Sequence, residues 1–234
     1  MGDGGKLYIV STPIGNLEDI TLRALRILGE VDLIAAEDTR HTRRLLDHYN
    51  IATPMVSFHA HNEHRKIAGL LEQAAGGRSI AVVSDAGTPG ISDPGFLIVR
   101  EAHRAGVEVV VIPGVSAVIF AAVASTLELD EFAFLGFPPV KSGRKRKFFE
   151  RIAAEDKSVF FYESPHRVSS SLGYIAECCG AQARVAIVRE ATKLHEEVIV
   201  GTAAELATEH AERKWKGEFV IGVARGEKSR KEGE

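Results

Sequence analysis

Residues that could bind a ligand or take up a proton gather in the stretch Ile80–Gly95, which reads IAVVSDAGTPGISDPG. Asp85 and Asp93 carry carboxylates that accept hydrogen bonds from hydroxyl or amine donors. Gly87 and Gly90 lack a Cβ, so a ligand can approach the backbone closely there. The apolar start followed by this polar loop predicts a buried strand that ends in a ligand-binding loop. A plain strand-to-helix turn is the alternative.

Four similar polar clusters follow other short apolar runs in the first half of the chain. They are Thr12–Asn16, Glu37–Arg40, His59–His61 and Pro113–Ser116. Ligands of open α/β sheets bind at the carboxyl ends of the strands. Five clusters that all follow predicted strands therefore indicate one shared cleft.

Strands and helices that alternate along the chain must position these clusters. Strands are predicted at residues 6–11, 31–36, 56–59, 80–83 and 107–112, with helices at 21–29, 42–49, 67–75 and 96–105 between them. This alternation predicts an α/β domain with a parallel sheet. A run of small and apolar residues at 115–124 predicts a buried helix.

The second half of the chain has a different spacing of elements. Strands are predicted at 132–136, 158–162, 184–189, 196–202 and 218–223, and helices at 145–154, 167–179 and 203–213. These strands lie too close together for a helix between every pair, which predicts a mixed sheet. The expected domains are residues 1–115 and 116–226, followed by a disordered charged tail at 227–234.

The composition is that of a soluble globular protein. The 234 residues are 45% hydrophobic and 26% charged, with a net charge of −3. Such a charge gives no overall polyanion-binding character, so any contact with nucleic acid must come from a local basic patch. We expect the neighbouring Cys178 and Cys179 to be reduced thiols. No membrane span or signal peptide is predicted, so the cytoplasm is the expected location.

Several familiar chemistries are not supported by the spacing of residues. The chain has no G-x-x-x-x-G-K-[ST] phosphate loop, no G-x-G-x-x-G after its first strand and no G-x-S-x-G elbow. His59, His61 and His64 lack the context of a metal site, and a solvated or substrate-facing loop is the better interpretation. We therefore expect no bound metal.

A short basic run follows the turn Phe137–Pro139. Its five cations in seven residues are Lys141, Arg144, Lys145, Arg146 and Lys147. Positive charge opposes the dipole at a helix N-terminus, so this run requires a reason beyond local stability. Contact with RNA phosphates would supply that reason, and a solvated helix start is the alternative. Two more charged turns, Glu163–Arg167 and Arg189–Glu197, either face the cleft or form surface salt bridges.

Taken in order, the motifs resemble one known family over roughly residues 6–223. They are STPIGNLEDIT, AAEDTRHTRRLL, FHAHNE, SDAGTPGISDPG, PGVSA, GFPP with the basic run, FYESPHR and REATKLHEE. This order is similar to that of the ribosomal RNA small subunit methyltransferase I family. That family belongs to the tetrapyrrole methylase superfamily, the class III S-adenosylmethionine-dependent methyltransferases.

The resemblance implies a fold, a cofactor and a reaction. An N-terminal parallel-sheet α/β domain and a C-terminal mixed-sheet α/β domain would grip S-adenosylmethionine between them, in a homodimer. The implied reaction is 2′-O-methylation of a cytidine ribose in the decoding centre of 16S rRNA, within the small ribosomal subunit. Carried over by motif, the residues that bind the methyl donor are Pro13, Ile14, Gly15, Asp85, Ala86, Gly87, Ile91, Ser116, Ala117 and Tyr162.

This sequence differs from many relatives at two places. Val115 stands where many relatives have proline, so the turn is expected to be less rigid. Many relatives continue into another small helical segment beyond the position of Glu234, and its contribution to RNA contact is not expected here.

A ribose hydroxyl is a weak acid, so transfer to it needs a base or a cation nearby. The predicted catalytic residues form two clusters that we expect to face each other over the cleft: Glu37, Asp38 and Arg40 in one, Glu163, His166 and Arg167 in the other. His61 and Lys193 are further candidates. Two alternatives remain open. One is a methyltransferase of the same fold acting on a tetrapyrrole, another small substrate or a protein side chain, and the other is a non-catalytic ligand-binding module.

Overall fold

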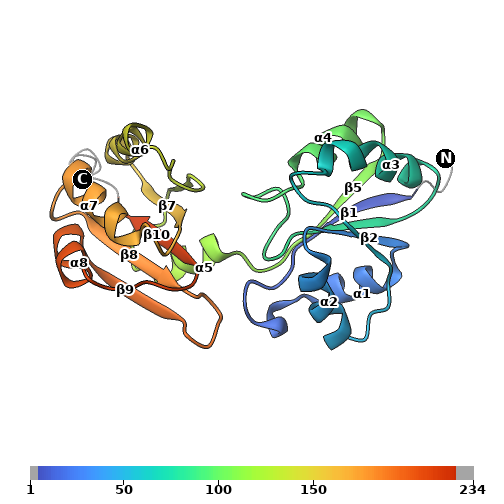
Figure 1. The fold of residues 1–234 in the computed structure, drawn as a ribbon, viewed down its shortest axis with the longest axis horizontal. Helices are drawn as coiled ribbons and strands as arrows, with labels where there is room; N and C mark the ends of the chain where they lie inside the picture. Colours follow the sequence, from blue (N-terminus) through green and yellow to red (C-terminus); the bar gives the residue numbers. More distant parts are fainter. Residues whose placement is uncertain (1–4, 225–234) are drawn as a thin grey trace. The chain divides into compact units, whose positions relative to one another are not determined.

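The chain folds into two compact units, which divide between Ser116 and Ala117 (Figure 1). The structure is a computed structural model and describes residues 5–224. The predicted boundary lies one residue earlier, between 115 and 116. The tail predicted to be disordered, 227–234, lies outside the described residues.

The first unit contains a five-stranded sheet in which all neighbouring strands run parallel. Its elements are β1 (Lys6–Val10), a 3-10 turn (Leu17–Asp19), α1 (Leu22–Glu30), β2 (Leu33–Ala36), α2 (Thr39–His48), β3 (Met55–Ser57), α3 (Glu63–Ala75), β4 (Ile80–Val83), α4 (Phe96–Arg104) and β5 (Glu108–Ile112). The strand order is β3-β2-β4-β1-β5. The prediction of a parallel sheet is confirmed, and all five carboxyl ends lie at one edge.

Helices cover both faces of this sheet, which explains its apolar central strands. Every residue of β2 and β4 is buried. One face packs against α3 and α4 through residues such as Leu70 and Ile98, and the other packs against α1 and α2 through Leu28 and Leu46. Figure 1 shows the two helix layers on opposite sides of the sheet. Because burial on both faces fixes the strands firmly, their polar ends are held in place.

The second unit has a five-stranded sheet of mixed direction, as predicted. Its elements are α5 (Ala117–Ala124), β6 (Phe132–Phe134), α6 (Ser142–Ala154), β7 (Ser158–Glu163), α7 (Val168–Cys178), β8 (Arg184–Arg189), β9 (Glu197–Thr202), α8 (Ala203–Glu209) and β10 (Phe219–Val223). The order is β6-β7-β10-β8-β9, and only the β6–β7 pair is parallel.

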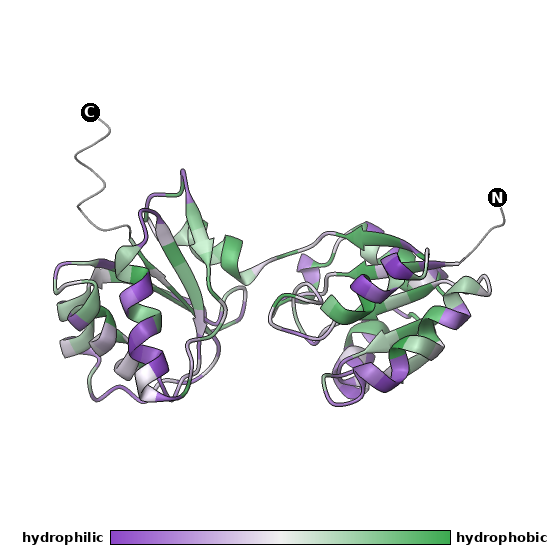
Figure 2. Cartoon of the chain, turned by 90° about the horizontal axis from the view of Figure 1, so that it is seen from above, coloured by the Kyte–Doolittle hydropathy of each residue, from purple (hydrophilic) through white to green (hydrophobic). Residues whose placement is uncertain are grey.

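This sheet also has an apolar layer on each face. The helix α5 packs on one face, and α6, α7 and α8 pack on the other. The strands of both units are predominantly hydrophobic, as Figure 2 shows. Within the described residues, no helix has the length and apolar character needed to cross a membrane.

Three helices begin earlier than the sequence pattern predicts. The first is α2, which starts at Thr39 rather than at residue 42, because Asp38 caps it by accepting a hydrogen bond from the Arg40 backbone N–H (2.8 Å). The others are α3, which starts at Glu63 rather than 67, and α6, which starts at Ser142 rather than 145. A residue predicted to serve chemistry, Asp38, therefore also begins a helix.

Candidate active site

The loops that follow β1 and β4 are joined backbone to backbone. Thr12 donates its N–H to the Gly87 carbonyl (2.9 Å), and Gly87 donates to the Thr12 carbonyl (3.1 Å). Gly87 has a φ of +72°, and a Cβ placed there would lie 3.6 Å from the Ile14 methyl carbon Cγ2. The structure thus brings together the predicted donor-binding turns Pro13–Gly15 and Asp85–Gly87.

The loops after β2 and β4 are joined through carboxylates. The Asp38 N–H donates to Asp85 Oδ1 (3.0 Å), and the Asp85 N–H donates to Glu37 Oε2 (3.3 Å). This reciprocal pair places the Glu37 carboxyl group beside Asp85. One residue predicted for proton transfer and one predicted for donor binding are therefore neighbours on the same sheet edge.

Glu37 and Asp38 differ in their affinity for a proton. Burial raises the pKa of Glu37 above its ordinary value, the hydrogen bond from the Asp85 backbone opposes that change, and the Asp85 charge adds to it. The pKa of Asp38 lies well below its ordinary value, because its carboxylate accepts hydrogen bonds from the Arg40 side chain (3.1 and 2.8 Å) and backbone. Glu37 is thus the better proton acceptor, while the Asp38 carboxylate is already occupied by hydrogen bonds from Arg40.

At the end of β3, the side chain of Asn62 fixes the orientation of His59. Asn62 Oδ1 accepts a hydrogen bond from the His59 backbone N–H (2.9 Å), so the amide nitrogen Nδ2 faces the His59 ring nitrogen Nε2 (3.0 Å). An amide nitrogen can only donate, so this contact is a hydrogen bond when His59 Nε2 carries no proton. His59 lies close enough to Glu37 for electrostatic interaction. His61, predicted from the sequence as a further candidate for proton transfer, is exposed and lies beside His59.

Small polar groups complete the edge at β1, β4 and β5. The hydroxyls of Ser11 and Thr88 lie 2.8 Å apart. A Cβ at Gly114 would come within 2.7 Å of the Ser11 Cβ, so the loop after β5 passes close to β1 only because residue 114 is glycine. Neither Ser11 nor Thr88 was among the predicted site residues, although each follows a strand closely. Ile91, a predicted donor contact, is 51% exposed on the same loop as Thr88.

In the second unit, Glu163 is buried and both of its carboxylate oxygens are engaged. Oε1 accepts from Arg167 Nε (2.9 Å) and from the Ser164 N–H (2.7 Å), and Oε2 accepts from the Ser171 hydroxyl. His166, between them in sequence, is exposed. These contacts give Glu163 and Arg167 a positioning role, and they favour Glu37 over Glu163 as the proton acceptor.

Replacing Glu163 by alanine should lower the free energy of unfolding by about 3 kcal/mol, because the change leaves the half-buried Arg167 guanidinium without its carboxylate. Urea unfolding followed by circular dichroism measures this. Glu163→Gln retains hydrogen-bond acceptors and should cost less. A Glu163→Ala protein as stable as the wild type would contradict the positioning role.

Tyr162 and Ala117, two further predicted donor contacts, belong to one apolar cluster of the second unit. Both pack against the buried group that includes Val188. The Tyr162 ring also contacts Phe134, with ring centroids 4.8 Å apart. Ser116 is the last residue of the first unit.

The five predicted RNA-binding cations do not form a uniform group. Lys145 is buried; its Nζ donates to the Ser170 hydroxyl (3.3 Å), and burial lowers its pKa. Arg146 pairs with Glu177 (2.8 Å) on the surface. Lys141, Arg144 and Lys147 are exposed. Four of the five cations are therefore exposed to solvent as an RNA contact would require, and one of these four, Arg146, is paired with Glu177.

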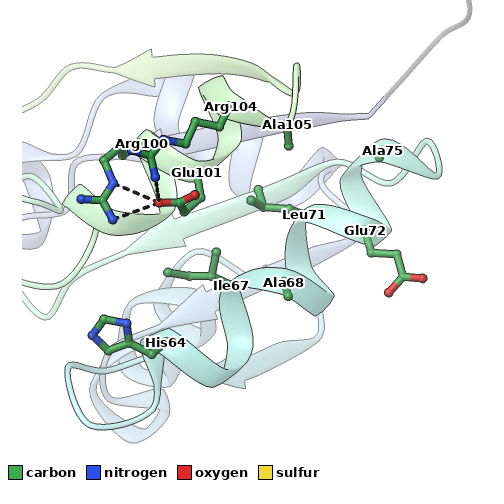
Figure 3. Close-up of a pocket in the computed structure, with 10 residues that line it drawn as sticks. All are labelled: His64, Ile67, Ala68, Leu71, Glu72, Ala75, Arg100, Glu101, Arg104 and Ala105. Atoms are coloured by element: carbon green, nitrogen blue, oxygen red, sulfur yellow. Dashed lines mark hydrogen bonds and ion pairs between the residues drawn. The ribbon is translucent and has the colours of Figure 1, made fainter.

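A separate groove of about 620 Å³ lies between α3 and α4 (Figure 3). Its floor includes Ile67 and Leu71, and at its rim Glu101 accepts hydrogen bonds from Arg100 (3.0 Å) and Arg104 (2.9 Å). These residues belong to helices that cover the sheet, whereas the predicted site residues of this unit lie at the strand ends. Among the described residues, no group of three or more His, Cys, Asp or Glu side chains is arranged to hold a metal ion.

Comparison with known proteins gives matches over most of the chain. The family model of tetrapyrrole (corrin/porphyrin) methylases matches residues 6–207. A Vibrio cholerae serotype O1 protein named ribosomal RNA small subunit methyltransferase I is 50% identical over 220 residues, which cover 93% of this chain and 76% of that protein. A Synechocystis sp. protein of the same name is 44% identical over 220 residues, covering 94% and 79%.

Among solved structures, this chain is similar to a uroporphyrin-III C-methyl transferase from Thermus thermophilus complexed with S-adenyl homocysteine. The TM-score is 0.66 at 20% identity, and the match covers 97% of this chain and 99% of that chain. At this level of identity the likeness establishes the two-unit α/β fold.

Proposed function

Because this chain belongs to the ribosomal RNA small subunit methyltransferase I family, we propose that it methylates the ribose 2′-oxygen of a decoding-centre cytidine in 16S rRNA. The chain is an S-adenosylmethionine-dependent methyltransferase that acts on rRNA. The nucleotide and the oxygen that receive the methyl group are the part we propose.

The observation that carries this proposal is the placement of Asp85 beside Glu37 at the carboxyl edge of the first sheet. A carboxylate there can accept hydrogen bonds from the ribose hydroxyls or the amino group of a methyl donor. Gly87 and Gly114 let the loops of this edge pack closely, because a Cβ at these positions would meet the side chains of Ile14 and Ser11. The edge therefore fits a nucleoside-bearing donor.

S-adenosylmethionine supplies a methyl group already activated by its sulfonium. The chain must then bind and orient the reactants, and orientation can lower the barrier by roughly 7–11 kcal/mol. We assign donor binding to ten residues: Pro13, Ile14, Gly15, Asp85, Ala86, Gly87, Ile91, Ser116, Ala117 and Tyr162. Glu37 is the group that we assign to accept the ribose hydroxyl proton, since burial gives it the higher proton affinity.

Removing three of the four exposed cations of the basic run, and keeping Arg146 because it is paired with Glu177, should weaken RNA binding and reduce its salt dependence. Each lost phosphate contact should lower the slope of log affinity against log salt by roughly 0.7–0.9. We therefore expect Lys141→Ala/Arg144→Ala/Lys147→Ala to reduce the slope by about 2, measured by binding to small subunits at several salt concentrations.

A matched control removes the same charge from the same unit. Arg184→Ala/Lys214→Ala/Lys216→Ala changes three exposed cations outside the basic run. An equal loss of slope in the control would show that the effect comes from total charge rather than from this run.

We further propose that the enzyme acts as a homodimer in the cytoplasm, on the assembled small subunit. Light scattering at the concentration used for catalysis measures the oligomeric state, and a monomer would contradict the dimer. Methyl transfer to assembled subunits should exceed transfer to naked 16S rRNA.

Methyl transfer from labelled S-adenosylmethionine tests the proposed reaction. Small subunits that lack the modification should become labelled in their 16S rRNA. Label in a tetrapyrrole or in ribosomal protein, with none in the RNA, would contradict the proposal, and so would donor binding without any transfer.

A further inference from the structure

The loop that joins β6 to α6 is fixed on both sides of one exposed aromatic residue. The chain turns at Gly136, whose φ is +66° and whose carbonyl accepts a hydrogen bond from the Tyr162 N–H (2.9 Å). Two residues later, the Pro138 carbonyl accepts one from Arg167 Nη1 (3.2 Å). The backbone on either side of Phe137 is therefore held to the end of β7 and the start of α7.

The buried ion pair described above supports this loop. Glu163 orients Arg167, and Arg167 in turn holds the Pro138 carbonyl. Pro138 and Pro139 have φ angles restricted by their rings, which further limits motion of the loop. Binding through a segment held in this way costs little conformational entropy.

Phe137 is 53% exposed although it stands on a rigid loop. One part of its ring contacts Tyr162, with centroids 5.2 Å apart and planes inclined by 51°. Tyr162 in turn contacts Phe134, which joins Phe137 to the aromatic side chains of the sheet. The exposed part of the ring presents an aromatic surface next to a residue that we assign to donor binding.

Positive charges lie immediately after this ring in the chain. Lys141 and Arg144 are exposed at the start of α6, four and seven residues beyond Phe137. An exposed aromatic ring followed closely in the chain by exposed cations is a combination that suits single-stranded nucleic acid, because bases stack on the ring while phosphates bind the cations. Neither feature alone would indicate this ligand, since isolated exposed apolar residues and charge runs are both common.

We propose that Phe137 stacks against an unpaired nucleobase of the RNA substrate, with Lys141 and Arg144 binding the adjacent phosphates. Rings of all four bases have a stacking face, so this contact holds the strand without reading its sequence. The inference rests on the proposed function for its RNA substrate. It adds a base-stacking residue to the charge contacts assigned above.

Affinity for a single-stranded oligoribonucleotide of roughly 10 residues, with a fluorescent 2-aminopurine base, tests the stacking contact directly. The full chain is used, without methyl donor. Phe137→Ala should bind roughly tenfold more weakly and lose the quenching of 2-aminopurine that stacking causes. Phe137→Trp should bind at least as tightly as the wild type, and Phe137→Leu should bind as weakly as Phe137→Ala.

Three controls separate stacking from charge, from the loss of any exposed apolar side chain and from loss of structure. Phe137→Ala should leave the salt dependence of binding unchanged, whereas Lys141→Ala/Arg144→Ala should reduce it. Leu194→Ala removes another exposed apolar side chain, on the loop between β8 and β9, and should not alter RNA affinity. Phe137→Ala should still unfold cooperatively at a midpoint only slightly below that of the wild type, because it loses the ring contact with Tyr162 but no fully buried side chain.

Three results would overturn the inference: binding by Phe137→Ala within twofold of the wild type, full binding by Phe137→Leu, or an equal effect on double-stranded RNA. Failure of the proposed function gives a different pattern. In that case wild-type protein would not methylate the small subunit, while the comparison among Phe137 variants would still report on stacking.

Discussion

Asp85→Ala should bind S-adenosylmethionine roughly 10- to 100-fold more weakly than the wild type, measured by isothermal titration. A hydrogen bond to a charged group contributes about 1.5–3 kcal/mol, which corresponds to that range of affinity. The substitution also removes the acceptor of the Asp38 N–H, so the loops after β2 and β4 lose one of their two mutual hydrogen bonds.

The asparagine variant separates these two effects of Asp85. Asp85→Asn retains a side-chain oxygen for the Asp38 N–H but removes the negative charge. We expect its donor affinity to lie between those of the wild type and Asp85→Ala. Donor affinity of Asp85→Ala within twofold of the wild type would contradict the placement of the donor at this edge.

Glu37→Gln should slow single-turnover methyl transfer roughly 10²- to 10³-fold at saturating donor, because general-base catalysis contributes on that scale. Glutamine has nearly the same shape and can still accept the hydrogen bond from the Asp85 N–H, so donor affinity should change little. The matched control is Glu108→Gln, which removes an exposed carboxylate at the amino end of β5, the opposite edge of the sheet. A Glu37→Gln enzyme with the wild-type rate would show that another group takes the proton.

The pH dependence of transfer gives an independent test of Glu37. Its raised pKa means that the carboxyl group keeps its proton to a higher pH than an ordinary glutamate, whose pKa is about 4.3. The base works only when deprotonated, so the rate should fall as the pH drops through this raised value. The fall should therefore begin above the ordinary range of glutamate and should be absent in Glu37→Gln. A rate profile unaffected by the substitution would contradict the assignment.

The sequence predicts the strands of the first unit well because each is a short apolar run bounded by polar residues. The observed β2 and β4, for example, fall within or coincide with the predicted ranges 31–36 and 80–83. A strand that is buried on both faces needs apolar residues at every position, and such strands are typical of parallel sheets. The apolar runs therefore predict a parallel sheet. The strand order arises from pairings between residues distant in the sequence, which no local pattern encodes.

Asp38 and Glu163 show why a list of polar residues does not define a site. Asp38 caps α2 and binds Arg40, and Glu163 holds Arg167 in the interior. From the sequence alone, a carboxylate that caps a helix or fills a buried ion pair looks the same as one that meets a substrate. Their catalytic roles, with those of Arg40, His166 and Arg167, stay predictions.

Lys145 could have been separated from its neighbours by the helical period. Phe149 and Ile152 follow it by four and seven residues, and all three lie buried on one face of α6. The same spacing in the sequence predicts that position 145 faces the core. By contrast, the loop that carries Phe137 is held by hydrogen bonds from Tyr162 and Arg167 to the carbonyls of Gly136 and Pro138, which the sequence does not reveal.

Nucleoside analysis of the methylated RNA tests the central claim most directly. Small subunits lacking the modification would be incubated with the purified protein and S-adenosylmethionine, and their 16S rRNA digested and examined by mass spectrometry. We expect 2′-O-methylcytidine at a single position of the decoding centre, formed by the wild type and strongly reduced with Asp85→Ala and with Glu37→Gln. A methyl group on a base, or ribose methylation that both variants carry out at the wild-type rate, would contradict it.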